Sequence, residues 1–414
     1  MSAGATSIAP APAPRAPARD KSHHIAEIDA LRGLGMFGIL AVHMDSYVPW
    51  FHYIPGIAEG WGIMAMALFF IISGYAITLS LKIHKPLRPG ASPIKAFMVR
   101  RLWRVQPLVF CWIGFVLFGT CFLNSTGYFG TMRENSTGAL FVFLIMANWR
   151  YVTKAGLGAF GIYWSFSVEE QFYLVYPFLM FKVRNRRAVL YGLGAAMLLL
   201  MPIFNVLALN WFLPKYSLAR EFLLAVWWYQ CILAGIGVYA LAGDYMRHFS
   251  PRYDKAIRLF ALFLLAVVPI PFALKNAPLL ITTTSPEYAM LASGFVVFAA
   301  VLSKRNAPFP ATKFLAWFGA RSFGLYLAHF PCGIVNRIIW SSLVPGGKNP
   351  GTFLTCAAFA SFIMLVFGIT EILHRLVEKP AMAMGHRISK RMLEDVYAPA
   401  AATAVAADAP AQAS

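Results

Sequence analysis

The sequence predicts an all-α fold, a polytopic transmembrane helical bundle of about ten spans. Of its 414 residues, 59% are hydrophobic and only 13% are charged, whereas soluble proteins carry about a quarter charged residues. The apolar residues fall in runs that approach the roughly 20 residues needed to cross a bilayer as a helix. Basic residues collect in every second connection between those runs, which is the pattern that sets orientation in a membrane.

About ten apolar runs approach or exceed a crossing once tilt is allowed. They cover residues 31–48, 60–81, 105–123, 162–181, 188–208, 221–242, 257–274, 288–302, 314–340 and 351–373. One further apolar segment, 139–149, is only about half a crossing long. We expect it to form a re-entrant or short helix within a long external connection, 124–161, because a full crossing would move the next basic loop to the opposite side.

Basic side chains follow the second, fourth, sixth and eighth predicted spans. They are Lys82, Lys85, Arg88, Lys95, Arg100, Arg101, Lys182, Arg184, Arg186, Arg187, Arg247, Arg252, Lys255, Arg258, Lys304, Arg305 and Lys313. Lys and Arg are enriched in cytoplasmic loops, so both ends of the chain are predicted to be cytoplasmic.

Three regions follow from this pattern. Residues 1–24 are Ala- and Pro-rich, lack the apolar core and cleavage site of a signal peptide, and are predicted to be a disordered cytoplasmic tail. Residues 25–385 form the membrane domain. Residues 386–414 form a second cytoplasmic tail, first basic and then Ala-rich.

Composition argues against nucleic-acid binding and against a metal site. Although 36 Lys and Arg face only 17 Asp and Glu, the positive charges lie in short loops beside apolar runs, not on a soluble face. The five cysteines lie within or beside apolar runs, with no CxxC pair and no histidine at metal-ligand spacing. They are predicted to be buried thiols, and no bound cofactor is expected.

Ionisable side chains inside the predicted spans are the candidate functional groups, because each costs several kcal/mol near the bilayer centre. Arg32 lies at the cytoplasmic entrance of the first span, and His43 lies about 16 Å deeper along the helix. Glu169 and Glu170 reach a similar depth from the external side in the fourth span. Adjacent carboxylates point to different helix faces, so at most one is expected to meet His43 and form a general base with it. A histidine that only bonds a neighbouring helix is the structural alternative.

Two arginines stand at the cytoplasmic start of the third span. Arg101 and Arg104 are three residues apart on one helical face, and paired guanidinium groups suit a polyanion such as the phosphates of coenzyme A. Snorkelling topology anchors are the alternative. Arg104 lies farther into the span than an anchor needs to be.

Other polar and glycine positions receive weaker interpretations. In the ninth span, Tyr326 and His329 share a face at i, i+3, and an aromatic belt explains Tyr326 equally well. The charges at the inner end of the last span are interpreted as solvated or capping groups: Glu371, His374, Arg375, Glu378 and Lys379. Four glycines are interpreted as close-packing positions: Gly33, Gly35, Gly38 and Gly74.

Six stretches of the sequence carry a resemblance to a known family. They are IDALRGLGMFGILAVH at 28–43, FFIISGYAIT at 69–78, RRLWRVQP at 100–107, WSFSVEEQFYLVYP at 164–177, RSFGLYLAHFP at 321–331 and VEKP at 377–380. In this order and spacing, they resemble acyltransferase family 3, the integral membrane O-acyltransferases that modify O-antigens, exopolysaccharides and other surface glycans.

The resemblance implies roles for the matching residues. His43 would be the essential catalytic histidine, accompanied by the carboxylates of Glu169 and Glu170. The arginines of two motifs would bind acyl-CoA: Arg101, Arg104 and, in support, Arg32. Three more residues would act on the acceptor or in support: Ser73, Tyr326 and His329.

The resemblance also implies a reaction. An acyl group, most often acetyl, would pass from cytoplasmic acyl-CoA as co-substrate to a hydroxyl of a surface or exported glycan or its lipid-linked precursor. We expect a location in the bacterial inner membrane, with the lipid bilayer, the glycan and polysaccharide assembly proteins as partners. His43 would act as general base or as transient acyl carrier.

A glycan or proton-coupled membrane transporter is the alternative function. In such a transporter, the histidine and carboxylates near the bilayer midplane would form a proton relay. The paired arginines favour the enzyme, because an acyl-CoA site needs them and a proton relay does not.

Overall fold

A computed structural model of the chain describes residues 26–48, 57–81, 93–152, 156–183, 186–196, 203, 207, 218–270, 279–302, 312–344 and 351–397. Within these ranges every regular element is a helix, which confirms the predicted all-α fold. The α-helices are α1 Ala26–Tyr47, α2 Ile57–Ser80, α3 Pro93–Phe122, α4 Met132–Phe143, α5 Ala147–Val152, α6 Tyr163–Lys182, α7 Arg186–Ala195, α9 Leu218–His248, α10 Asp254–Val267, α12 Leu279–Leu302, α13 Thr312–Gly319, α14 Ser322–Leu343, α15 Thr352–Leu373 and α16 Lys379–Tyr397. Short 3-10 or π segments are η2 Gly158–Phe160, η5 Pro251–Tyr253 and η7 His374–Glu378.

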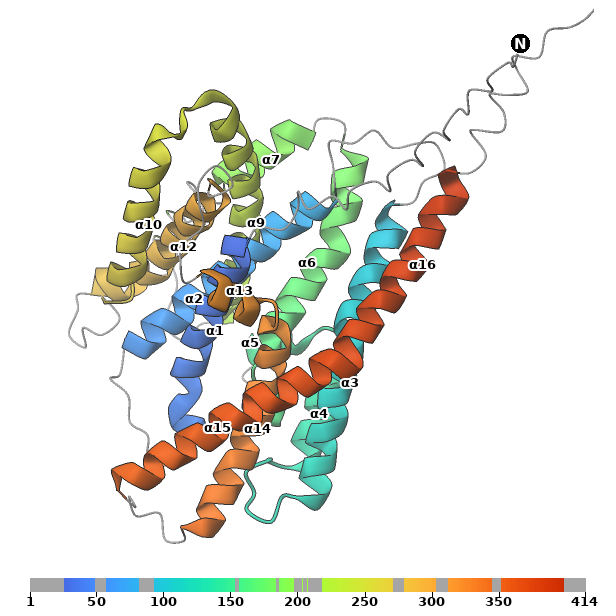
Figure 1. Ribbon diagram of the computed structural model, residues 1–414, viewed down its shortest axis with the longest axis vertical. Helices are drawn as coiled ribbons and strands as arrows, with labels where there is room; N and C mark the ends of the chain where they lie inside the picture. Colours follow the sequence, from blue (N-terminus) through green and yellow to red (C-terminus); the bar gives the residue numbers. More distant parts are fainter. Residues whose placement is uncertain are drawn as a thin grey trace, which may run out of the picture.

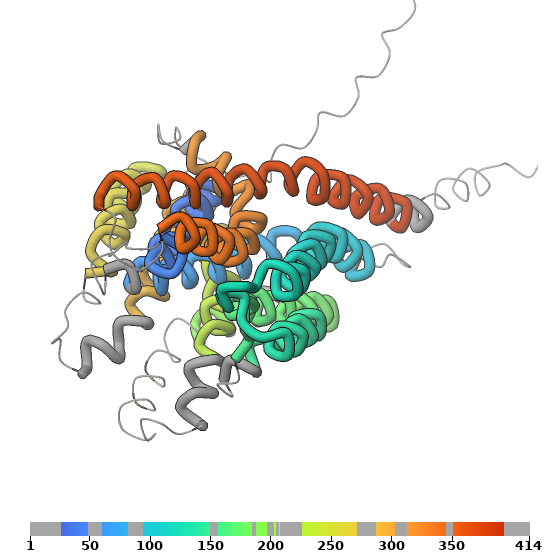
Figure 2. The backbone as a smooth tube through the Cα atoms, turned by 90° about the horizontal axis from the view of Figure 1, so that it is seen from below, coloured from blue at the N-terminus to red at the C-terminus, as the bar shows by residue number. Residues whose placement is uncertain are grey.

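Helices α1 and α2 lie together at the centre of the bundle (Figure 1). On one side α9 and α12 pack against α2, and α10 packs against α12. On the other side α16 runs along α3, with α4 beside α3 and α6 nearby, as the view from below also shows (Figure 2). The candidate site forms where the central pair meets α3, α6, α14 and α16.

Glycines set the closest helix contacts. A Cβ added to Gly74 of α2 would overlap the carbonyl oxygen of Ile232 in α9, and one added to Gly235 of α9 would overlap that of Ile71 in α2. The two backbones can approach this closely only because neither position carries a side chain. The packing role predicted for Gly74 is confirmed, and Gly33 packs in the same way against α13.

Four helices among the described residues are long and apolar enough to cross a membrane: Gly60–Ser80, Ile94–Phe122, Val226–His248 and Thr352–Met392. In the last of these, only 17% of the most apolar window is buried inside the protein. Large apolar side chains such as Phe118, Val175 and Phe353 are exposed on the outside of the bundle. Such a surface suits lipid rather than water, so the protein is a membrane protein, while the number of ten spans and the orientation stay predictions.

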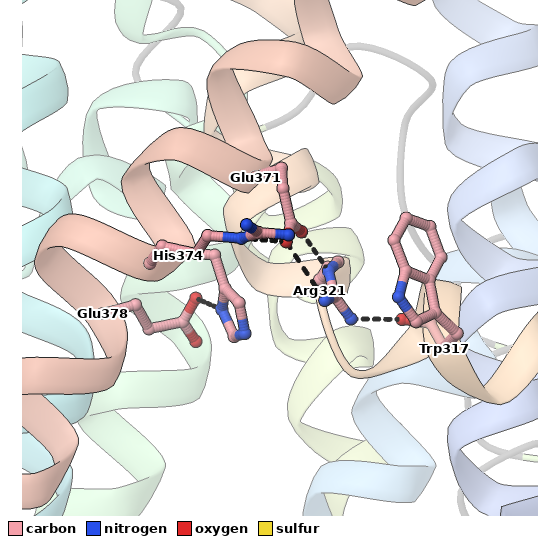
Figure 3. Close-up of polar contacts among 6 residues, drawn as sticks. Trp317, Arg321, Glu371, His374 and Glu378 are labelled. Carbon is pink, nitrogen blue, oxygen red and sulfur yellow. Dashed lines mark hydrogen bonds and ion pairs between the residues drawn. The ribbon is translucent and has the colours of Figure 1, made fainter.

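The ninth predicted span, 314–340, is wrong as a single helix. The chain breaks between α13 and α14, at Ala320 and Arg321. Arg321 Nη1 donates to the carbonyl oxygen of Trp317, 3.2 Å away, and Arg321 Nε donates to Glu371 Oε2 of α15 at 2.6 Å (Figure 3). These hydrogen bonds stabilise the interruption between α13 and α14. The guanidinium donates to a carbonyl at the end of α13 and connects the start of α14 to α15.

The segment 139–149 forms parts of two short helices, as the re-entrant or short-helix prediction allowed. Helix α4 has 12 residues and α5 has 6, so each is far below the roughly 20 residues of a crossing. Between them Ile145 has φ 59°, an unusual value for a β-branched residue. Gln171 Nε2 of α6 donates to the Ile145 carbonyl at 2.5 Å and stabilises this turn.

The end of the membrane domain predicted at 385 falls inside a helix. Residues 386–397 continue α16, and α15, η7 and α16 form one unbroken helical run (Figure 1). Residues 1–24 and 398–414 lie outside the described residues, as do parts of the predicted spans at 188–208 and 257–274. The basic loop residues Lys82, Lys85, Arg88, Arg184, Lys304 and Arg305 lie outside them as well.

The prediction of buried thiols holds for two of the five cysteines. Cys231 and Cys332 are buried, whereas Cys111, Cys121 and Cys356 are exposed. The exposed three lie on α3 and α15, helices apolar enough to face lipid, which accepts a small apolar thiol as readily as a protein core does.

Candidate active site

A cavity of about 340 Å³ lies between α1, α2, α3, α6, α14 and α16, within the size range of small-molecule sites. Its lining residues from α1, α3 and α14 lie in the first halves of these helices, the ends predicted to be cytoplasmic, whereas Ser165, Phe166 and Glu169 lie in the first half of α6, the end predicted to be external. Its ionisable lining residues are Arg32, Arg100, Arg101, Arg104, Glu169, Tyr173, Tyr326 and His386. With four arginines against one carboxylate in the wall, the cavity favours an anionic ligand.

Arg101 holds both carboxylates of α6. Its Nη2 lies 3.2 Å from Glu169 Oε1 and also donates to Glu170 Oε1. Ser73 Oγ donates to Glu169 Oε1 at 2.7 Å, and the guanidinium lies over the Tyr173 ring, 3.4 Å from its centroid. Arg101 is therefore a structural centre joining α3 to α6, with little of its side chain accessible.

This arrangement corrects the predicted pairing of His43 with a carboxylate. Among the described residues, the polar partners of Glu169 are Ser73 and Arg101, and Glu170 bonds Arg101. Glu170 is buried, so its negative charge requires the guanidinium beside it. Sequence spacing predicted that the histidine and the carboxylates lie at similar depths in the membrane. It could not predict toward which neighbouring helix each side chain points.

Arg104 differs from Arg101 although both share one face of α3. Arg104 keeps an accessible surface toward the cavity, and in the described part of the chain neither Arg104 nor Arg100 forms an ion pair. Arg32 is held by Asp29, with Nη1 2.9 Å from Oδ1. Arg100 and Arg104 are therefore the cations that remain available to a ligand.

Helix α16 closes one wall of the cavity with Met382 and His386. It approaches α3 at Gly385, where an added Cβ would lie 2.7 Å from the Cβ of Trp103. No side chain fits at that distance, so the glycine is what allows the close approach. Sequence reasoning missed Arg100, Tyr173 and His386 as cavity residues. An i, i+4 relation to Arg104 could have indicated Arg100, whereas no sequence signal pointed to His386.

Tyr326 lies in the cavity wall with its hydroxyl bonded inside the protein. It donates to the carbonyl oxygen of Ile162 at 2.6 Å and lies 2.5 Å from Ser165 Oγ. An aromatic-belt residue would direct its hydroxyl toward lipid headgroups, so the site interpretation of Tyr326 is favoured over the belt.

His43 and His329 lie next to each other, beyond Tyr326. Their ring centroids are 5.6 Å apart, and the ring of His329 lies 5.4 Å from that of Tyr326. His329 is 0% exposed, and its Nδ1 lies 2.5 Å from the carbonyl oxygen of Tyr326. Neither histidine lines the cavity itself, so Tyr326 separates the arginine-lined cavity from the pair of histidines.

The sequence suggested that the charges near the end of α15 are solvated or capping groups. In the structure not all of them are solvated. His374 and Glu378 are 7% and 3% exposed, with Nδ1 and Oε2 2.7 Å apart (Figure 3). Glu371 bonds Arg321 and Arg375. The predicted solvation is wrong for the buried pair, because α16 continues from η7 along α3 and covers it.

Within the described part of the chain, no three His, Cys, Asp or Glu side chains lie close enough together to hold a metal ion.

Comparison with protein families matches an acyltransferase domain to residues 25–371. The chain belongs to this acyltransferase family. The resemblance drawn from the sequence motifs is confirmed, and so is the predicted enzyme class, an enzyme that transfers acyl groups.

Two similar proteins of the family are bacterial. The peptidoglycan O-acetyltransferase OatA of Listeria monocytogenes is 27% identical over 337 residues, covering 74% of this chain and 49% of the relative. The O-acetyltransferase OatA of Staphylococcus aureus is 26% identical over 381 residues, covering 88% of this chain and 58% of the relative. The chain thus spans about half the length of these relatives. No solved structure matches it.

Proposed function

We propose that this protein is a membrane-bound O-acyltransferase that moves an acetyl group from acyl-CoA to a hydroxyl of a surface or exported glycan. The observation that carries the proposal is the cavity lined by four arginines, two of which, Arg100 and Arg104, form no ion pair within the described chain. Guanidinium groups bind phosphate with charge-assisted and often bidentate hydrogen bonds. The phosphates of coenzyme A supply that anion.

The rest of the lining suits the remainder of the donor. Met66, Phe69 and Phe70 of α2 line the cavity beside the arginines and offer apolar contact to a pantetheine arm. Tyr326 forms the part of the cavity wall that lies against His329. A donor bound by its phosphates near Arg100 and Arg104 would direct its thioester toward Tyr326 and His43.

His43 supplies the base in this proposal. It removes the proton of the acceptor hydroxyl while that oxygen bonds to the thioester carbonyl carbon. The carbon–sulfur bond then breaks, and the departing thiolate of coenzyme A takes the proton from His43. Alternatively, a ring nitrogen of His43 first attacks the thioester carbon and expels the thiolate of coenzyme A, and the acceptor hydroxyl then displaces the imidazole from the acyl group while its proton passes to the thiolate. Acetyl-CoA is a co-substrate in both schemes, and no bound cofactor is needed.

The relatives support the acceptor class. One of them is named for O-acetylation of peptidoglycan, a polymer of sugars, and the candidate site here carries the same family's motifs. We infer that the acceptor is a glycan hydroxyl at the external side of the bacterial inner membrane, reached with the help of polysaccharide assembly proteins.

The test is acyl transfer by histidine variants. A strain lacking the gene is complemented with the wild type, His43→Ala, His43→Gln or His248→Gln, and acetyl esters on its surface polysaccharide are measured by mass spectrometry. We expect both His43 variants to lose transfer by about a hundredfold or more, because neither alanine nor an amide accepts a proton at neutral pH. His248 is exposed and bonds the Asp244 carbonyl, so its variant is the matched control.

Two outcomes would contradict the proposal. Retention of most acetylation by His43→Gln at normal expression would make the histidine structural. Loss of the whole polymer in the deletion strain, rather than of its acetyl esters, would favour the glycan or proton-coupled transporter. Transfer of labelled acetyl from acetyl-CoA by the purified protein then tests the donor directly.

A further inference from the structure

Among the described residues no carboxylate forms a hydrogen bond with His43, the proposed base, and Asp45 acts on its ring only through its charge. A general-base histidine needs a partner on its second ring nitrogen, which fixes the tautomer and stabilises the imidazolium that forms. In this chain the candidate carboxylates, Glu169 and Glu170, bond Arg101. The rings that lie against His43 are those of His329 and Tyr47, with centroids 5.6 and 5.9 Å away.

The hydrogen bond of His329 determines which of its nitrogens carries the proton. A carbonyl oxygen can only accept, so the short contact from Nδ1 to the Tyr326 carbonyl places the hydrogen on Nδ1. In the neutral ring Nε2 then bears a lone pair and is an acceptor. Helix α14 itself therefore sets the tautomer of His329.

Nε2 of His329 is buried and has no hydrogen-bond partner among the described residues. Buried polar atoms are almost always paired, and an exception calls for an explanation such as a catalytic role. The ring centroids of His43 and His329 are 5.6 Å apart, so a ring nitrogen of His43 comes within hydrogen-bonding distance of Nε2 when the two rings turn toward each other. Catalytic hydrogen bonds are often long before the substrate binds.

We propose that His329 is the positioning residue of His43, an inference that rests on the proposed function. Its Nε2 accepts the ring N–H of His43, which leaves the other nitrogen of His43 unprotonated and directed at the acceptor hydroxyl. When that hydroxyl gives its proton to His43 and bonds to the acyl carbon, the hydrogen bond to His329 strengthens. The proton later leaves His43 with the thiolate, and His329 exchanges none.

A neutral partner suits this position better than a carboxylate. A base must be uncharged before it accepts a proton, and a buried carboxylate beside a neutral His43 would be a charge without a counterion, which is costly in a low dielectric. An imidazole held by a backbone carbonyl provides an acceptor without adding charge. In this proposal the hydrogen bonds from the Tyr326 carbonyl through His329 to His43 take the place of the carboxylate that orients the histidine in a catalytic triad.

Two substitutions of His329 separate its two bonds. In His329→Asn the shorter amide can still donate to the Tyr326 carbonyl but does not reach His43. In His329→Gln the longer amide brings an oxygen acceptor to the place of Nε2. We expect the asparagine variant to lower kcat about 10- to 100-fold, as for other positioning partners, with KM for acetyl-CoA unchanged. The glutamine variant should recover most of the loss, and the control His248→Asn should match the wild type.

Equal activity of the Asn and Gln variants would overturn the proposal, whether both are active or both inactive. Tyr47 provides the rival partner, since its hydroxyl is also buried and without a hydrogen-bond partner in the described chain. If Tyr47→Phe lowers kcat as His329→Asn does while His329→Gln stays low, Tyr47 orients His43 and His329 does not.

A second readout does not depend on turnover. Nitrogen NMR of the protein labelled with 15N-histidine reports the tautomer of His43 directly. We expect the His43 ring signals to shift in His329→Asn and to stay near the wild-type positions in His329→Gln. Signals unchanged in both variants overturn the proposal. Failure of the wild type to transfer acetyl would instead contradict the proposed function, and the NMR result would still decide the role of His329.

Discussion

At the scale of single residues, the two motif arginines have different surroundings. Arg101 is fixed between Glu169, Glu170 and the Tyr173 ring, so its charge is already used within the protein. Arg104, one turn farther along α3, faces the cavity without an ion pair in the described chain. The sequence motif presents them as an equivalent pair, whereas their contacts make one a helix connector and the other a candidate ligand contact.

We expect Arg101→Ala to destabilise the protein by about 3 kcal/mol, because it leaves the buried Glu170 carboxylate without a counterion. Arg104→Ala should leave stability near that of the wild type and raise KM for acetyl-CoA about tenfold, the effect of one lost charge-assisted bond. Thermal unfolding in detergent and steady-state kinetics measure the two effects. The double variant Arg101→Ala with Glu170→Gln should regain part of the lost stability, and equal unfolding temperatures for all these proteins would contradict this account.

At the scale of helices, the central packing depends on backbone contact. Helices α2 and α9 meet through Gly74 and Gly235, where each backbone touches the carbonyl of the other helix. Lipid is as apolar as a leucine side chain, so close packing rather than hydrophobic burial holds such helices together. The position of α2 matters to the site, because α2 also carries Ser73, which bonds Glu169.

Gly74→Ala should therefore destabilise the protein by about 1–3 kcal/mol, since the added methyl group forces the two helices apart. Gly114→Ala is the matched control, because a Cβ at Gly114 meets nothing within 4 Å. That second change should be neutral or stabilising by about 0.5–1 kcal/mol, as alanine favours a helix over glycine. Thermal unfolding of both variants measures the two effects. A Gly74→Ala protein as stable as the wild type would show that α2 and α9 are not in close contact at this position.

At the scale of the whole molecule, the orientation in the membrane decides which substrate reaches which end of the site. The four arginines line the cavity from the first halves of α1 and α3, and His43 lies farther along α1. If those helix starts are cytoplasmic, as the basic loops predict, acyl-CoA reaches the arginines from inside the cell.

Cysteine accessibility tests this orientation. Lys95, near the start of α3, and Ser136, in α4 beyond the end of α3, are both exposed. In a variant without the five native cysteines, we expect Ser136→Cys to react with an impermeant reagent added to whole cells. Lys95→Cys should react only after the membrane is permeabilised. The reverse labelling pattern would show the opposite orientation in the membrane, with the arginines on the external side.

The sequence by itself determined the all-α membrane fold, the acyltransferase family and five of the ionisable residues in the cavity wall, which are Arg32, Arg101, Arg104, Glu169 and Tyr326. Each of these depends on composition or on local spacing, which the chain carries along its length. Apolar runs predict helices in lipid, and i, i+3 spacing places Arg101 and Arg104 on one face of a helix. The break at Ala320 and Arg321 was missed because the bond that holds it comes from Glu371, on another helix.

Only the tertiary structure decided which side chains meet. Similar depths of His43, Glu169 and Glu170 suggested a histidine–carboxylate pair, but depth leaves the rotation of each helix about its axis undetermined. That rotation is set by contacts between helices distant in sequence, such as those made at Gly33 and Gly74. It turns Glu169 and Glu170 toward Arg101 and brings His329, from a helix nearly three hundred residues later, against His43.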